Sequence, residues 1–132
     1  LYYAICVVSV NRNKSNTELD LISLEKADKV MDDFIIKRPD YLDAYFFKAR
    51  INDLIGKYEI MANNYQLFVD SISAKGEAEI TKNKAKFIEA YNEIAENYAR
   101  LNNKVKAKEF LNKTLALDPS NAFAIENMKL LK

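Results

Sequence analysis

The sequence predicts an all-α fold, and three observations support that prediction. Apolar residues make up 49% of the 132 residues, which is enough to bury a core, and the chain has only two glycines and two prolines. So few turn-forming residues favour long helices with short connections over a sheet with many turns. Apolar residues also recur at spacings of three and four, and no segment alternates with period two for long enough to form a strand. We expect about seven helices, arranged as antiparallel hairpins.

The first helix is expected over residues 2–12, where apolar residues occupy nearly every side. Cys6 lies within this run, in the stretch AICVVSV, and we expect its thiol to be buried and inert. A single cysteine builds no disulfide framework, so the cysteine content does not indicate whether the protein lies in an oxidising or a reducing compartment. The apolar run of residues 1–10 is too short to cross a bilayer, which argues against membrane insertion.

The second helix is expected after Thr17 and Asp20, whose spacing resembles a capping box with Asp in place of Glu or Gln. Its apolar positions follow one helical face: Leu21, Leu24, Ala27, Val30, Met31 and Phe34. The helix ends at KRPD, because Pro39 disfavours helical geometry at Arg38. Residues 11–17, NRNKSNT, are expected to form an enlarged turn between the two helices.

Further helices complete the predicted order. Asp40 is expected to cap a helix over residues 41–55, Gly56 to end it, and KYEIMANNYQLFVDSI to form the next one. After a pause around residues 73–76, helices are expected over residues 77–101, 104–117 and 121–131. Pro119 ends one of these helices, and Ser120 or Asn121 caps the next.

Charge and residue content argue against several function classes. The 20 basic and 19 acidic residues give a net charge of +1, which provides little field for steering nucleic acid or an anionic membrane. The chain has no histidine, the commonest general base and metal ligand. Glu89, Glu93 and Glu96 share a helical face, but helical dimetal sites also need Glu-x-x-His pairs. Glutamates flank the lysine-rich stretch KNKAK at 82–86, which favours a solvated helix face. We expect no metal, no cofactor and no enzymatic activity.

The most specific pattern is a series of large and small residues at fixed distances before each proline. Before Pro119 the series is Tyr91, Ile94, Ala95, Tyr98, Ala107, Leu111 and Thr114. Before Pro39 its last three positions recur as Ala27, Met31 and Phe34. With a repeat length of about 34 residues, the next repeat begins at Leu42. In this repeat, the positions that the pattern specifies are occupied by Tyr45, Ala49, Gly56, Tyr58, Met61, Tyr65 and Phe68.

In this order of residue types the chain resembles the tetratricopeptide repeat (TPR) family over roughly residues 20–132. Gly56-Lys57-Tyr58 is similar to the family's turn, whereas Thr114 replaces the usual Ala and Lys48 replaces an aliphatic residue. The resemblance implies a right-handed stack of antiparallel helix hairpins, a TPR-like α-solenoid. The expected parts of this single domain are a divergent repeat at 1–41, a repeat at 42–75, an insertion at 76–87 that extends a helix, a repeat at 88–121 and a closing helix at 122–132.

The resemblance also implies a concave groove lined by the first helix of each pair. Its positions in this chain are Asp43, Phe46, Phe47, Arg50, Asp53, Glu89, Asn92, Glu93, Glu96 and Arg100. Some family members clamp a peptide's C-terminal carboxylate with Lys, Asn and Arg here, but this chain has mostly Asp, Phe and Glu. We therefore expect a non-catalytic scaffold whose acidic groove, with Phe46 on its floor, binds a basic or amphipathic segment of a protein or peptide. In the competing interpretation the glutamates are a solvated face, and Phe46 or Phe47 packs on a neighbouring repeat.

The second function class is a structural spacer or oligomerisation module of a larger multi-repeat protein, with no groove ligand. The apolar last helix, NAFAIENMKLL, has either a narrow exposed side or a contact with another copy, so the terminal helices could mediate self-association. The first residue is not Met, and we expect the chain to be the C-terminal part of a longer protein. A likeness to uncharacterised bacterial TPR proteins implies the cell envelope rather than the cytoplasm.

Overall fold

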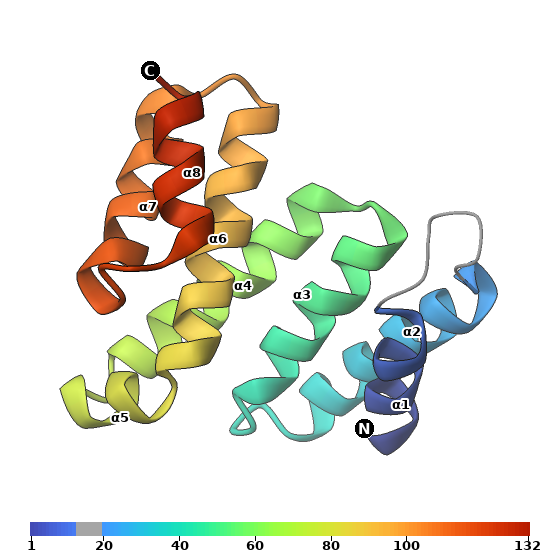
Figure 1. Ribbon diagram of the computed structural model, residues 1–132. Helices are drawn as coiled ribbons and strands as arrows, with labels where there is room; N and C mark the ends of the chain where they lie inside the picture. The colour runs from blue at the N-terminus through green and yellow to red at the C-terminus, as the bar shows by residue number, and fades with distance from the viewer. Residues whose placement is uncertain (13–19) are drawn as a thin grey trace. The chain divides into compact units, whose positions relative to one another are not determined.

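The computed structural model describes residues 1–12 and 20–132, and these residues form eight α-helices and no strand (Figure 1). The helices are α1 (Tyr2–Asn11), α2 (Leu21–Lys37), α3 (Asp43–Ile55), α4 (Tyr58–Ser73), α5 (Glu77–Lys82), α6 (Lys84–Arg100), α7 (Lys104–Leu117) and α8 (Ala122–Leu130). The all-α prediction is confirmed. No helix of the described part of the chain is long and apolar enough to cross a membrane.

The chain divides into two compact units, Leu1–Phe68 and Val69–Lys132, and the boundary falls inside α4. In the first unit α1, α2 and α3 pack against one another around small and branched side chains. The buried members of this core are Ala4, Val7, Val8, Leu24, Ala27, Met31, Ala44 and Ile51. Alanines at these positions let the helices approach closely, so the longer side chains fill the remaining space.

Aromatic rings join α3 to the part of α4 that lies in the first unit. The ring of Phe46 contacts the ring of Tyr65 at 5.6 Å and that of Phe68 at 5.2 Å between centroids. All three side chains are buried, and each contributes roughly 1.5–3 kcal/mol through burial. Gly56 separates the two helices with φ +90°, a left-handed geometry that glycine adopts without strain, so the predicted end of α3 is confirmed.

The start of α2 differs in detail from the predicted capping box. Asp20 is itself the N-cap, and its carboxylate accepts the backbone N–H of Ser23 at 3.1 Å and the Ser23 hydroxyl at 2.5 Å. The predicted partner Thr17 and most of the expected turn at 11–17 lie outside the described residues. Buried Asn11 joins the end of α1 to this cap. Its Nδ2 donates to the carbonyl of Val7 at 2.9 Å, and its Oδ1 accepts the N–H of Asp20 at 3.0 Å.

The predicted cap of α3 is wrong. Asp40 does not cap this helix, which begins at Asp43 after Leu42. The carboxylate of Asp40 instead accepts two hydrogen bonds from the guanidinium of Arg38, at 3.0 and 3.1 Å. The carboxylate is thus paired with Arg38, two residues earlier in the chain.

The predicted single helix over residues 77–101 is also wrong, because Asn83 breaks it. The backbone of Asn83 has φ −105° and ψ 17°, and its Nδ2 donates to the carbonyl of Glu79 at 2.8 Å. An asparagine side chain that bonds the preceding turn competes with the backbone ladder. The expected insertion at 76–87 therefore forms the separate helix α5, and only its last residues extend α6.

In the second unit α6 and α7 form a hairpin, and α8 packs against α7 (Figure 1). Ala95 and Ala107 are buried in it as the repeat predicts, and the rings of Tyr98 and Phe110 stack at 5.7 Å. Asn121 caps α8 by accepting the N–H of Ala124 at 3.0 Å, which decides between the two predicted caps after Pro119.

Candidate functional site

The structure corrects the predicted role of Phe46 as the floor of a groove. Its side chain is fully buried between the rings of α4, so it belongs to the core of the first unit. The guanidinium of Arg50 lies over the Phe46 ring, 4.4 Å from the centroid. Arg50 therefore covers the ring through a cation–π contact, and a ligand cannot reach Phe46 without displacing it.

The other predicted positions on α3 are partly exposed. Asp43, Phe47, Arg50 and Asp53 lie at helical spacings of three and four, so they share one face of α3. This face combines two carboxylates, one guanidinium and one half-buried ring. The ring of Phe47 also packs against the core of the first unit, so the face is mainly a charged one.

In the second unit the predicted positions on α6 divide into a structural residue and a partly exposed set. Buried Asn92 accepts the hydroxyl of Thr114 at 2.7 Å and donates to Asn121 at 3.4 Å. This corrects its assignment to a groove, because its amide ties α6 to α7 and to the cap of α8. The remaining positions are Glu89, Glu93, Glu96 and Arg100. Arg100 pairs with Glu96 at 3.5 Å. With Lys84 and Lys86 in its first turn, α6 carries three basic and three acidic residues.

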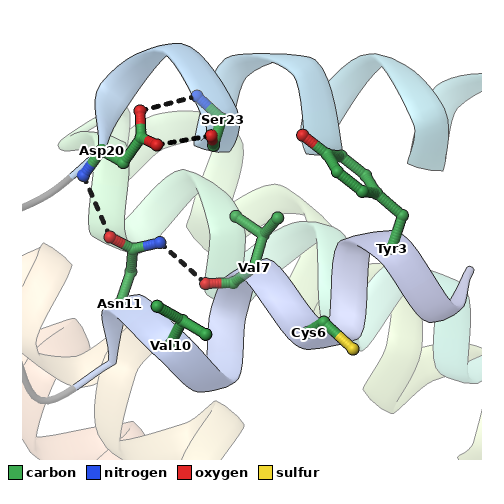
Figure 2. Close-up of a pocket in the computed structure, with 7 residues that line it drawn as sticks. All are labelled: Tyr3, Cys6, Val7, Val10, Asn11, Asp20 and Ser23. Carbon is green, nitrogen blue, oxygen red and sulfur yellow. Dashed lines mark hydrogen bonds between the residues drawn. The ribbon is translucent and has the colours of Figure 1, made fainter.

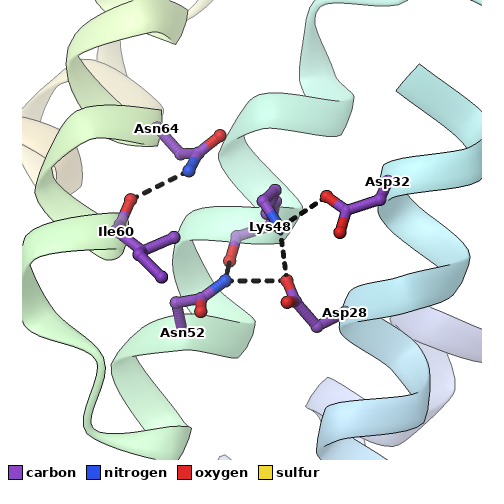
Figure 3. A network of polar contacts seen from close by, with 6 residues as sticks. All are labelled: Asp28, Asp32, Lys48, Asn52, Ile60 and Asn64. Carbon is purple, nitrogen blue, oxygen red and sulfur yellow. Dashed lines mark hydrogen bonds and ion pairs between the residues drawn. The ribbon is translucent and has the colours of Figure 1, made fainter. Parts of the chain in front are cut away.

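A polar network between α2 and α3 was not predicted as a unit (Figure 3). The ammonium of Lys48 lies 2.7 Å from the carboxylate of Asp28 and 2.6 Å from that of Asp32. Asn52 donates to the same Asp28 oxygen at 2.8 Å and to the carbonyl of Lys48 at 2.9 Å. The only sequence signal was a lysine in place of an aliphatic residue. The aspartates that match it come from the preceding helix, which the sequence alone does not place beside it.

The Lys48 network is largely shielded from water. The side chains of Lys48 and Asp28 are 13% and 16% exposed, whereas that of Asp32 is 52% exposed. Burial by itself would lower the pKa of Lys48, but the hydrogen bonds that its ammonium donates to Asp28 and Asp32 outweigh this effect and raise the pKa above the ordinary lysine value. Lys48 is thus held as a cation. Among the described residues, the Oδ1 of Asn52 is the buried side-chain oxygen that has no hydrogen-bond partner.

A hollow of about 210 Å³ lies between α1 and the start of α2 (Figure 2). Its walls are Tyr3, Cys6, Val7, Val10, Asn11, Asp20 and Ser23. The prediction that Cys6 is buried is wrong, since its thiol is exposed and faces this hollow. Asn11, Asp20 and Ser23 hydrogen-bond to one another or to the Val7 carbonyl, so the polar side of the hollow is occupied by the fold's own contacts.

Neither a metal-binding geometry nor a similarity to known proteins indicates what these sites bind. Within the described residues, no group of three His, Cys, Asp or Glu side chains is placed to hold a metal ion. No protein family model matches the chain, and no curated protein is significantly similar to it. The site is therefore defined by its residues alone, as a charged, partly exposed helix face in each unit.

Proposed function

We propose that the chain is a non-catalytic scaffold that binds a protein or peptide segment on the exposed face of the first helix in each hairpin. The proposed architecture is a TPR-like right-handed stack, in which α3 and α6 are these first helices. The observation that supports it most directly is burial at the repeat positions. Ala27, Ala49, Ala95 and Ala107 are all buried, as close helix packing in such a repeat requires.

The partner that suits these faces is a basic or amphipathic segment. On α6 the three glutamates lie together on one face, and Arg100 at the end of this face is paired with Glu96. Lys84 and Lys86 in the first turn make the helix neutral as a whole. A cationic partner would gain charge-assisted contacts there. On the first unit, the ring of Phe47 packs against the core and is only partly exposed, so it adds a small apolar area. Because Phe46 and Asn92 are buried, recognition would depend on the carboxylates and Phe47 rather than on all ten predicted positions.

The proposal can be tested with a labelled amphipathic peptide of lysine and leucine, titrated against the protein by fluorescence anisotropy. The variant E89Q/E93Q removes two charges from α6, and E77Q/E79Q makes the same change on α5 in the same unit. We expect E89Q/E93Q to weaken binding roughly threefold or more, and E77Q/E79Q to have a smaller effect. Equal effects of the two variants, or no binding by the unmodified protein, would overturn the proposal.

The alternative is a structural spacer or oligomerisation module, and the surface of the first unit favours it. Helix α1 has no charged residue, and Tyr2 and Val10 are 86% and 62% exposed. Ile22 at the start of α2 adds a further exposed apolar side chain. Exposed apolar area of this kind marks association surfaces. Light scattering after size exclusion tests this reading, since a monomer at every concentration would exclude self-association through α1 or α8.

A further inference from the structure

Helix α7 has an exposed face on which lysines, rather than glutamates, predominate. Its outer positions Val105, Glu109, Asn112 and Ala116 are four, three and four residues apart and follow one line along the helix, which is uncharged apart from Glu109. Lysines flank this line on both sides, with Lys104 and Lys108 on one side and Lys106 and Lys113 on the other. We call these eight residues the α7 lysine face. With Glu109 as the single acidic residue, the helix has a charge of 4 − 1 = +3.

The lysine face is exposed and includes apolar side chains. Val105 is 79% exposed, and Leu101 in the turn before α7 is 68% exposed. Lys104, Lys106 and Lys113 are also exposed, whereas Ala107, Phe110, Leu111 and Thr114 on the opposite side form the buried face. An exposed valine beside an exposed leucine has no role in the core of this unit.

The lysines are placed where they oppose the stability of their own helix. The first turn of α7 contains Lys104 and Lys106 and no acidic residue, so both cations lie at the positive end of the helix dipole. Lys104 and Lys108 are also four residues apart, a spacing at which like charges repel. A face selected only for solubility would favour pairs such as Lys129 with Glu126 on α8. Sequence features that oppose local stability are expected at functional surfaces.

The charges of the lysine face are only partly neutralised within the chain. Lys106 pairs with Glu109 at 3.2 Å, and the ammonium of Lys113 is held 4.9 Å from the centroid of the Phe110 ring. Within the part of the chain that the structure describes, Lys104 and Lys108 have no ion-pair partner. Lys113 is therefore oriented in advance by an aromatic ring, and two further cations remain to be matched by an external anion.

From this surface we propose that α7 docks an acidic segment of a partner protein, in which carboxylates flank an uncharged stripe. Charge complementarity identifies the partner, since carboxylates on either side of such a stripe would meet the two lysine rows. Asn112 and Ala116 are small enough to let a helix approach closely. A lipid surface fits less well, because membrane-binding helices present several large apolar side chains and this face has a glutamate among its residues.

The test uses two labelled helical peptides with the same alanine and leucine stripe, one flanked by glutamates and the other by lysines. Binding is measured by anisotropy, and the contact is mapped from amide shifts in ¹⁵N spectra. We expect the acidic peptide to bind, with the largest shifts on α7, and the basic peptide not to shift α7. The variant K104Q/K108Q should weaken binding of the acidic peptide roughly threefold or more. The matched variant K75Q/K84Q, which removes two exposed lysines elsewhere in the unit, should have a smaller effect.

Four outcomes would overturn the proposal. They are no binding of the acidic peptide, equal effects of the two lysine variants, shifts outside α7, and tighter binding to vesicles with anionic lipid or to duplex DNA than to the acidic peptide. The result is independent of the proposed scaffold function, because E89Q/E93Q acts on α6 and should not weaken binding of the acidic peptide. Far-UV circular dichroism of each variant verifies that the helices are intact.

Discussion

The substitution Lys48→Met tests how much the buried polar network stabilises the first unit. Methionine retains most of the apolar stem and removes the charge, so the main change is the loss of the contacts to Asp28 and Asp32. The carboxylate of Asp28, with only 16% of its side chain exposed, would keep the Asn52 hydrogen bond but lose its counter-charge. Breaking a fully buried pair costs about 3–5 kcal/mol, and an exposed pair contributes about 0.2–1 kcal/mol.

The geometry places Lys48→Met between these two limits. Because Asp28 is mostly buried and Asp32 is half-exposed, we expect the free energy of unfolding to fall by about 2 kcal/mol. For an m-value of about 2 kcal/mol/M, the urea midpoint falls by roughly 1 M. Urea titration followed by circular dichroism measures this, with Lys29→Met on the exposed side of α2 as the matched control. A loss for Lys48→Met no larger than that for Lys29→Met would refute the reasoning.

The pH dependence of the stability of the wild type and of Lys48→Met supplies an independent check. Although burial opposes it, the two aspartates raise the pKa of Lys48 in the folded state. A raised lysine pKa contributes stability that is complete below the unfolded value of about 10.4 and is lost as pH rises through the folded value. The difference in stability between the wild type and Lys48→Met should therefore be constant from about pH 7 to 10 and shrink above that range. A difference that grows above pH 10 would contradict this assignment.

Three further substitutions or reactions test the fold. Thr114→Val should destabilise the second unit by about 1–3 kcal/mol in urea titrations, because the buried Oδ1 of Asn92 loses its 2.7 Å hydrogen bond; a neutral result would exclude that role. Gly56→Ala should cost about 1 kcal/mol, since φ is +90° while the space around a new Cβ is open; an increase in the melting temperature would contradict the left-handed turn. Cys6, the single cysteine, should react with a thiol reagent in the native protein, whereas a reaction that required urea would show that it is buried.

Helix positions were predictable from the sequence to a large extent, because the relevant signals are local. The predicted helix over 104–117 has the observed bounds, and Gly56 ends α3 as expected. The two wrong predictions, the unbroken helix over 77–101 and the cap of α3, also have local causes. In each case the sequence pattern allows two conformations and does not indicate which is more stable. Asn83 could continue a helix or bond to the turn before it, and Asp40 could cap α3 or pair with Arg38. In each case a side-chain hydrogen bond decided between two conformations of similar propensity.

The candidate site was less predictable, because exposure depends on residues far away in the sequence. Phe46 is apolar and lies on the predicted groove side of α3, but rings from α4 and the guanidinium of Arg50 cover it. Cys6 sits in an apolar run, but α2 and α3 bury the opposite side of α1, so its thiol remains exposed. Helical spacing identifies the residues that share a face, whereas only the packing partner determines which face is buried.

Two of the mismatches to the repeat pattern, Lys48 and Thr114, have a physical explanation in the structure. Lys48, in place of an aliphatic residue, pairs with Asp28 of the preceding helix, and Thr114, in place of alanine, donates to Asn92 of the preceding helix. In both units the unusual residue thus makes a polar contact across two helices, where the usual residue could make only an apolar one. Apolar contacts tolerate a sliding helix, but a 2.7 Å hydrogen bond requires one register. Replacing Thr114 by alanine should therefore reduce stability, because it leaves the buried oxygen of Asn92 without its donor.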